Sequence, residues 1–157
     1  MDMIWKALKE SLVILDMEAA SCWDVFSRLG GALIREGYVK NTYIDALCAR
    51  EKEYPTGLDI GGFGVAIPHT DASQVYRAAT AIAVLKNPVP FIQMGTDNEE
   101  IRVKIVFLLA VANPGEQMEE LQRILTIIQD TDILTNITQA GDVQNVIDII
   151  KEKERSL

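Results

Sequence analysis

Apolar residues occur along the chain in two alternating patterns, short continuous runs and stripes with helical spacing. A short continuous run is typical of a buried strand, whereas apolar residues that recur every three or four positions indicate an amphipathic helix. We therefore expect strands at residues 12–15, 65–67, 79–85, 89–93 and 104–112. Asn87 and Pro88 are expected to form the turn between the third and the fourth of these strands.

About five helices are expected from the stripes, and residues suited to helix ends accompany them. Gly37 and Pro55 mark the ends of the first two helices. Asn113 is suited to cap the third helix, and Thr131 and Asp142 to cap the last two. The expected apolar faces are Cys22, Val25, Phe26, Leu29 and Leu33; Tyr43, Ala46 and Leu47; Met118, Leu121, Leu125 and Ile128; Ile133, Leu134 and Ile137; and Val143, Val146, Ile147 and Ile150.

The alternation of helices and strands predicts an α/β fold. Residues 104–112 are apolar almost without a break, which is typical of a strand covered on both faces. Helices must then lie on both sides of the sheet. We expect a three-layer α/β/α sandwich with a mixed sheet of about four to five strands and about five helices, formed as a single domain by residues 1–157.

The net charge of the chain limits the classes of molecule that it is expected to bind. The 157 residues carry a formal net charge of −8, and no run of Lys or Arg exceeds a pair. Nucleic-acid binding needs a basic patch that neutralises phosphates, so no nucleic-acid partner is expected. The acidic surface is suited to a basic protein partner, or it simply keeps the protein in solution, and both interpretations stay open.

A cytoplasmic location is expected from several parts of the sequence. Charged residues are scattered through the first ten positions, so they do not resemble a signal peptide. The longest apolar run, residues 105–112, is much shorter than the roughly 20 residues of a membrane helix, so no membrane insertion is expected. Cys22 and Cys48 lack metal-site spacing and fall on apolar helix faces, where buried, reduced thiols are the usual occupants.

His69 is the one histidine of the sequence, and it follows Pro68 directly after the apolar run at residues 65–67. A proline at the end of a strand disfavours continuation of the ladder, so the imidazole is expected at the rim of the sheet, where open α/β sheets bind ligands. Neutral imidazole is a competent nucleophile near pH 7. Taken alone, such a histidine is more often a structural residue without a chemical role.

The sequence around His69 favours a chemical role over a structural one. Residues 61–70 read Gly-Gly-Phe-Gly-Val-Ala-Ile-Pro-His-Thr, which resembles the active-site signature of the fructose- and mannitol-type enzyme IIA domains of sugar phosphotransferase systems. The resemblance extends from about Leu12 to Lys151 and is greatest to the galactitol-specific IIA proteins. Domains of this family have a three-layer α/β/α fold and carry a phosphoryl group on the histidine of the signature.

The resemblance implies a function as well as a fold. It implies that His69 accepts a phosphoryl group from phospho-HPr and passes it to a IIB component, with the membrane IIC component as an indirect partner, for galactitol or a related sugar alcohol. The alternative is a regulatory IIA-like domain whose phosphorylation signals nutrient state to a protein partner. No cofactor and no metal are expected, since the chain lacks a Gly-Lys-Ser/Thr phosphate loop and an acidic cluster around the histidine.

Three further residues are candidates for the site. Arg50 continues the apolar face of the second helix, so it either reaches past that face to solvent or points to the site. Mannitol-type IIA domains carry an active-site arginine at a similar distance before their signature, which implies that Arg50 stabilises phosphate charge. Thr70 either donates its hydroxyl to a phosphate oxygen or caps the next turn. Asp71 is a weaker candidate, for orienting the imidazole.

Gln117 marks a departure from the family pattern. Many relatives have a second histidine after an acidic residue in the loop that follows the long strand, and here Glu116 precedes Gln117. The glutamine amide can donate a hydrogen bond to phosphate but carries no positive charge. We also expect apolar residues around His69 to receive the partner proteins, with Phe63, Val65, Met94 and Met118 as candidates. The alternative is that these residues belong to the core, which the sequence favours for Val65. The sequence leaves open which ring nitrogen of His69 carries the phosphoryl group.

Overall fold

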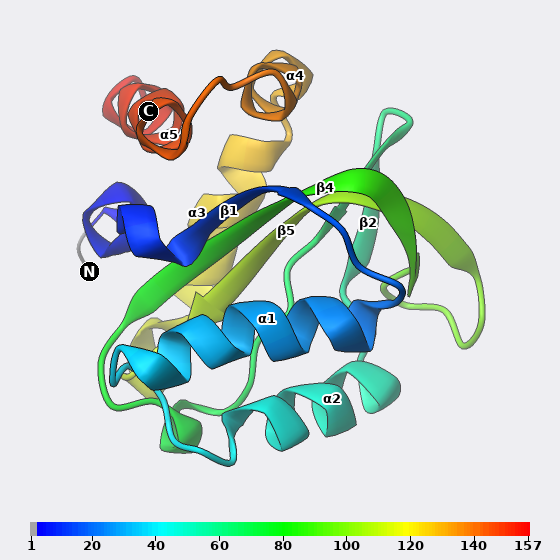
Figure 1. The fold of residues 1–157 in the computed structure, drawn as a ribbon, viewed down its shortest axis with the longest axis vertical. Coiled ribbons are helices and arrows are strands. Elements are labelled where there is room, and N and C mark those ends of the chain that lie inside the picture. The colour runs from blue at the N-terminus through cyan, green and yellow to red at the C-terminus, as the bar shows by residue number, and fades with distance from the viewer. Residues whose placement is uncertain (1–2) are drawn as a thin grey trace.

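The computed structural model describes residues 3–157, and helices lie on both faces of its single sheet (Figure 1). Helices α1 and α2 cover one face, and α3, α4 and α5 cover the other. The predicted three-layer α/β/α sandwich is therefore confirmed. The helices of this described part are α1 (Cys22–Arg35), α2 (Tyr43–Glu53), α3 (Gln117–Ile128), α4 (Thr131–Thr138) and α5 (Val143–Arg155).

Within residues 3–157 the sheet has five strands, in the order β1-β4-β5-β3-β2, and it is mixed. Strand β1 is parallel to β4 and β3 is parallel to β5, whereas the pairs β4–β5 and β2–β3 are antiparallel. The carboxyl ends of β3 and β5 therefore point toward the same end of the sheet. The strands are β1 (Val13–Met17), β2 (Gly57–Ile60), β3 (Phe63–Ala66), β4 (Ala79–Ile92) and β5 (Glu100–Ala110).

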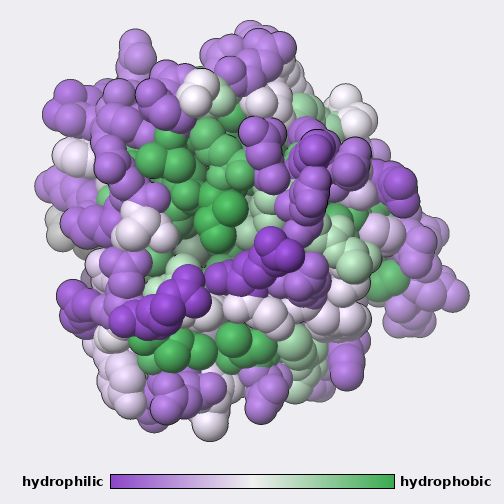
Figure 2. Space-filling model, in the orientation of Figure 1, coloured by the Kyte–Doolittle hydropathy of each residue, from purple (hydrophilic) through white to green (hydrophobic). Residues whose placement is uncertain are grey.

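The sheet separates two hydrophobic cores. Along β5, Val106 and Leu108 pack on the side of α1 and α2, while Phe107 packs on the side of α3, α4 and α5. The long apolar run is thus covered on both faces, as its sequence predicts. On the second side Leu15 and Ile133 stay half-buried, and Figure 2 shows apolar surface between the C-terminal helices and the layer of α1 and α2.

The turn predicted at Asn87 and Pro88 is wrong. Strand β4 continues through both residues, and the register against β5 shifts between Val84 and Val89. Lys86, Asn87 and Pro88 are exposed there. A proline can remain within a strand at such an irregularity because no ladder hydrogen bond from its nitrogen is required. The two predicted strands are one bent strand.

Strand β2 was not predicted from the sequence, although the turn after it has a strong signal. Gly61 and Gly62 join β2 to β3, and both have positive φ, 58° and 89°. Two such residues form the turn that matches the twist of a β-hairpin. Gly64 has another role, because a Cβ there would lie 1.7 Å from the carbonyl oxygen of Arg102.

Two helix predictions need correction. Met118 was expected on the buried face of α3 but is 66% exposed. The buried residues of α3 are Glu120, Ile124, Ile127 and Ile128, because the helix turns the Ile124–Ile127 side toward the sheet. Helix α4 is capped by Asp130 and not by Thr131, since the Asp130 carboxylate accepts hydrogen bonds from the backbone N–H groups of residues 132 and 133. Asp142 caps α5 as predicted.

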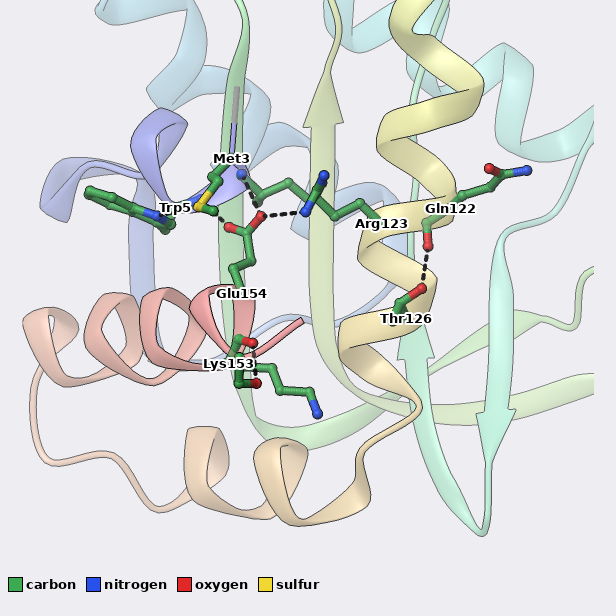
Figure 3. A network of polar contacts seen from close by, with 9 residues as sticks. Met3, Trp5, Gln122, Arg123, Thr126, Lys153 and Glu154 are labelled. Carbon is green, nitrogen blue, oxygen red and sulfur yellow. Dashed lines mark hydrogen bonds and ion pairs between the residues drawn. The ribbon is translucent and has the colours of Figure 1, made fainter. Parts of the chain in front are cut away.

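Glu154 joins α5 to the N-terminal 3₁₀ turn (Ile4–Ala7) through a buried carboxylate (Figure 3). The carboxylate accepts hydrogen bonds from the backbone N–H groups of Ile4, at 3.0 Å, and Trp5, at 2.7 Å. Arg123 of α3 approaches the same carboxylate at 3.7 Å. One side chain therefore ties together three segments that are far apart in the sequence.

Replacing Glu154 with alanine is expected to lower the free energy of unfolding by about 3 kcal/mol. The substitution leaves backbone donors and a partly buried arginine without their acceptor. Urea denaturation measures the change. Glu152→Ala is the matched control, because this glutamate is exposed on the same helix and its loss should change stability by less than about 0.5 kcal/mol. Equal effects of the two substitutions would contradict the role of Glu154.

Candidate functional site

His69 lies three residues past the carboxyl end of β3, opposite Leu109 near the carboxyl end of β5. The backbone N–H of Leu109 donates to the carbonyl of Pro68 at 3.1 Å, and His69 forms an isolated parallel bridge with Leu109. Pro68 lacks an N–H and ends the regular ladder of the strand. The histidine is thereby fixed at the rim of the sheet, and its side chain is half-buried.

The imidazole of His69 is oriented by the carbonyl of Ile67. The ring Nδ1 lies 2.9 Å from this oxygen. A carbonyl oxygen only accepts hydrogen bonds, so Nδ1 must carry the proton that it donates. In the neutral ring Nε2 then holds the free lone pair, which makes Nε2 the nucleophilic nitrogen.

The surroundings of His69 keep the ring neutral at pH 7. Burial lowers the pKa of His69 below its ordinary value of 6.5, and the positive charge of Arg50 lowers it further. The hydrogen bond with Ile67 and the negative charge of Asp71 act in the opposite direction but do not reverse the shift. The nucleophilic form is thus populated without a neighbouring base.

Arg50 reaches the segment that follows His69 and is not simply extended into solvent. Its Nη1 lies 3.5 Å from Oδ1 of Asp71, and its guanidinium carbon lies 5.0 Å from the ring centroid of Tyr54. Its Nε is buried and has no hydrogen-bond partner among the described residues. A cation with unused donors is therefore held close enough to His69 to affect the pKa of the imidazole.

Two aromatic residues that support this arrangement were missed as parts of the site. Tyr43 is fully buried in α2, and its hydroxyl donates to the carbonyl of Leu109 at 3.4 Å. This contact sets the start of α2 against the end of β5, beside His69. Tyr54 lies four residues after Arg50, directly after the end of α2, and a spacing of four residues is the sequence signal that predicts such a contact.

Thr70 and Gln117 hold the two loops of the site together. The amide of Gln117 donates to the backbone carbonyl of Thr70 at 2.8 Å. The Thr70 hydroxyl donates to the carbonyl of Asp71 at 3.1 Å, so in this structure it supports the local turn. The Asp71 carboxylate pairs with Arg50. Phosphate contacts by Thr70 and Gln117 stay a prediction.

Of the four apolar residues expected around His69, Val65 and Phe63 belong to the second core, whereas Met94 and Met118 are exposed. Val65 is fully buried, and Phe63 packs into the second core at the far end of β3, so neither borders the histidine. Met94 is exposed and follows β4, where its N–H donates to Gly57. Met118 is exposed beside Gln117. Tyr54 adds exposed aromatic surface beside Arg50.

The sequence of this chain matches a known protein family over most of its length. Residues 6–153 match the family model described as "Phosphoenolpyruvate-dependent sugar phosphotransferase system, EIIA 2". The chain belongs to this family. The resemblance that residues 61–70 indicate is therefore confirmed, and the chain is a phosphotransferase component.

Several proteins described as EIIA or IIA proteins are similar to the chain over most of its length. The galactitol-specific EIIA component of Escherichia coli K12 is 32% identical over 123 residues, which are 77% of this chain and 80% of that protein. The nitrogen regulatory protein IIA-Ntr of Neisseria meningitidis is 32% identical, with a TM-score of 0.77, and the match covers 94% of this chain and 98% of that one.

A second similar structure contains two proteins. It is the complex of the mannitol enzyme IIA with the phosphorylated mannitol enzyme IIB of Escherichia coli. The match has a TM-score of 0.77 at 20% identity and covers 92% of this chain and 97% of that one. At this identity the similarity demonstrates a shared EIIA fold. Within residues 3–157 of the present chain, no helix is long and apolar enough to cross a bilayer.

Proposed function

We propose that this chain is a phosphocarrier of a sugar-uptake phosphotransferase system. His69 accepts a phosphoryl group from phospho-HPr and passes it to the IIB component of the same system, which serves the membrane component IIC. The observation that carries the proposal is the orientation of His69, whose Nδ1 is engaged by Ile67 so that Nε2 is the free nucleophile. The similarity to the galactitol-specific component points to galactitol or a related sugar alcohol.

The transfer exchanges one phosphorus–nitrogen bond for another. The lone pair of Nε2 attacks the phosphorus of the donor phosphohistidine, the donor P–N bond breaks, and its electron pair stays on the donor imidazole. A new P–N bond joins the phosphoryl group to His69, which becomes the donor when the nucleophile of IIB attacks. Phosphoryl transfer passes through a loose transition state, so the protein mainly positions the reactants and stabilises charge.

Arg50 is the cation that this transition state requires. Its guanidinium presents donors in a planar fork that matches phosphate oxygens, and its buried Nε has no other partner among the described residues. Gln117 positions the loop through the Thr70 carbonyl, and its second amide hydrogen is available for a phosphate oxygen. The Thr70 hydroxyl must leave the carbonyl of Asp71 before it can contribute.

The small size of the cleft beside the site agrees with a protein-bound substrate. A cleft of about 220 Å³ lies between α2 and residues 70–74, and Arg50 and Asp71 are among its lining residues. A cleft of about 370 Å³ lies instead at the opposite end of β4 and β5, beside Ile92 and Glu100. A phosphocarrier receives its substrate on the surface of another protein, so a deep pocket beside His69 is unnecessary.

Reconstitution tests the proposal. Incubation with phosphoenolpyruvate, enzyme I and HPr should add one acid-labile phosphoryl group to each chain, as intact mass measures it. ATP alone should add none. Onward transfer to a galactitol-type IIB component then distinguishes a transport carrier from the regulatory alternative, which would accept the group without passing it on. The comparisons favour the carrier, since the family model and the galactitol-specific relative are both described as parts of sugar phosphotransferase systems.

Apolar contact beside His69 gives a further prediction. Met118→Glu should lower kcat/KM for transfer from phospho-HPr by about tenfold or more, because an unpaired charge becomes buried when the partner docks. Leu157→Glu is the control, since Leu157 is also exposed but lies at the end of the chain. Transfer rates should also fall only modestly with salt. A steep salt dependence with no effect of Met118→Glu would place docking on the charged surface.

A further inference from the structure

The ion pair between Arg50 and Asp71 lies close enough to His69 for both charges to act on the imidazole. We propose that Asp71 is an exchangeable counter-ion, which Arg50 releases when His69 becomes phosphorylated and recovers when the group leaves. Asp71 thereby sets how firmly His69 retains the phosphoryl group. The inference rests on the proposed function, and it makes Asp71 a positioning residue that acts through Arg50 and forms no bond to the group.

The geometry of the pair is that of a contact easily exchanged. One nitrogen, Nη1, approaches one oxygen at 3.5 Å, which is long and lacks the paired bonds of a forked arginine–carboxylate contact. The Asp71 side chain is 77% exposed and that of Arg50 is 35% exposed. Water screens such a pair, so it is worth little compared with a contact to a phosphoryl dianion.

The Asp71 carboxylate is directed to Arg50 although a local use is available. Asp71 precedes the 3₁₀ turn Ala72–Gln74 at its N-cap position, where an aspartate usually accepts a hydrogen bond from the turn. Here the side chain makes no capping hydrogen bond. The carboxylate is therefore held by the arginine alone among the contacts described for it.

The Tyr54 ring can hold the guanidinium of Arg50 in position while its ion-pair partner changes from Asp71 to the phosphoryl group. The guanidinium lies over the Tyr54 ring, 5.0 Å from ring centroid to guanidinium carbon. This contact does not use the N–H donors, so it can persist whichever anion those donors face. The exchange then needs only a rotation at the end of the arginine side chain, while α2, which carries Arg50, and Tyr54, which follows the helix, stay fixed.

The two charges act on His69 in opposite directions. In the unphosphorylated protein Arg50 lowers the pKa of His69 and Asp71 raises it. A phosphoryl group carries about −1.5 to −2 charges at pH 7, so Arg50 stabilises it and Asp71 both repels it and competes for the arginine. This competition favours onward transfer, which a carrier requires as much as acceptance.

Asp71→Asn tests the inference through the equilibrium between HPr and this chain. At a fixed ratio of phospho-HPr to HPr, the ratio of phosphorylated to free chain should rise about two- to fivefold, the range expected for a partly exposed charge pair. Glu53→Gln is the matched control, because Glu53 is an exposed carboxylate that lines the same cleft, and the same charge change there should leave the ratio within about 1.5-fold. An unchanged or lower ratio for Asp71→Asn would overturn the inference.

A double-mutant cycle separates exchange from simple repulsion. If Asp71 acts by competing for the arginine, Asp71→Asn should raise the ratio less in an Arg50→Ala background than in the wild type. An equal rise in both backgrounds would mean that Asp71 only repels the phosphoryl group, and the exchange would be refuted.

A small donor makes the test independent of the protein partner. Phosphoramidate can supply the phosphoryl group to His69 directly, and Asp71→Asn should then slow loss of the group from the phosphorylated chain about two- to fivefold. A wild-type chain that phosphoramidate labels but phospho-HPr does not would contradict the proposed function and leave the inference testable. Equal loss rates for the variant and the wild type would contradict the inference even if transfer from HPr succeeds.

Discussion

His69→Ala is expected to abolish phosphorylation by phosphoenolpyruvate, enzyme I and HPr while the protein stays folded. His69 is the one histidine of the sequence, so no other imidazole can take over as the nucleophile. The side chain is half-buried at the rim of the sheet, and its loss should cost no more than about 1 kcal/mol of stability. Intact mass measures the label, and circular dichroism with urea denaturation measures the fold.

The informative comparison is between labelling and folding in the same sample. A folded variant that still acquires an acid-labile phosphoryl group would mean that another residue is the acceptor. Loss of labelling together with loss of the folded state would leave the role of His69 to be judged from His69→Gln, which retains a polar side chain of similar length. That variant should fold and should also remain unlabelled.

Arg50→Ala is expected to slow transfer from phospho-HPr by about 10²- to 10³-fold, the usual cost of removing a donor that stabilises transition-state charge. Stability should change by less than about 1 kcal/mol, because the described contacts of Arg50, with the carboxylate of Asp71 and the ring of Tyr54, are made to exposed side chains. Arg50→Lys should restore part of the rate, since lysine supplies the charge but not the planar fork. Rapid-quench measurement of a single turnover gives the rate.

Arg35→Ala is the matched control for this substitution. Arg35 is an exposed arginine at the end of α1, and its removal should leave the transfer rate unchanged. If Arg50→Ala transfers as fast as Arg35→Ala, the arginine is a structural residue that packs on Tyr54, and phosphate charge must be stabilised by other groups.

The layers of the fold and the place of the histidine could be predicted from local sequence. A strand that is apolar on both faces requires helices on both sides, and residues 104–112 show this pattern directly. Pro68 breaks the ladder just before His69, which places the imidazole at the rim. Both predictions depend on residues that are adjacent in the chain, and both are confirmed.

The errors arose where local signals are overridden by the rest of the fold. Asn87 and Pro88 are turn formers, yet pairing with β5 on both sides of the irregularity keeps β4 continuous. In α3 two apolar stripes lie side by side, and the sheet selects the one containing Ile124 and Ile127. Sequence periodicity alone does not rank two such stripes.

The pairing of Arg50 with Asp71 could not be predicted for a different reason. The two residues are 21 positions apart and lie on a helix and a loop that meet only in the folded chain. From the sequence each is a separate candidate: Arg50 either reaches solvent or stabilises phosphate charge, and Asp71 is a weaker candidate for orienting the imidazole. The contact of Gln117 with the Thr70 carbonyl, 47 positions apart, is equally invisible before folding.

The most direct test of the central claim is the nuclear magnetic resonance spectrum of the phosphorylated chain labelled with ¹⁵N in its histidine. With Nδ1 donating to the carbonyl of Ile67 at 2.9 Å, the phosphoryl group must be carried by Nε2. We predict a phosphorus–nitrogen coupling to Nε2 of His69, with the Nδ1 proton retained. A phosphoryl group on Nδ1, or on any residue other than His69, would contradict the account.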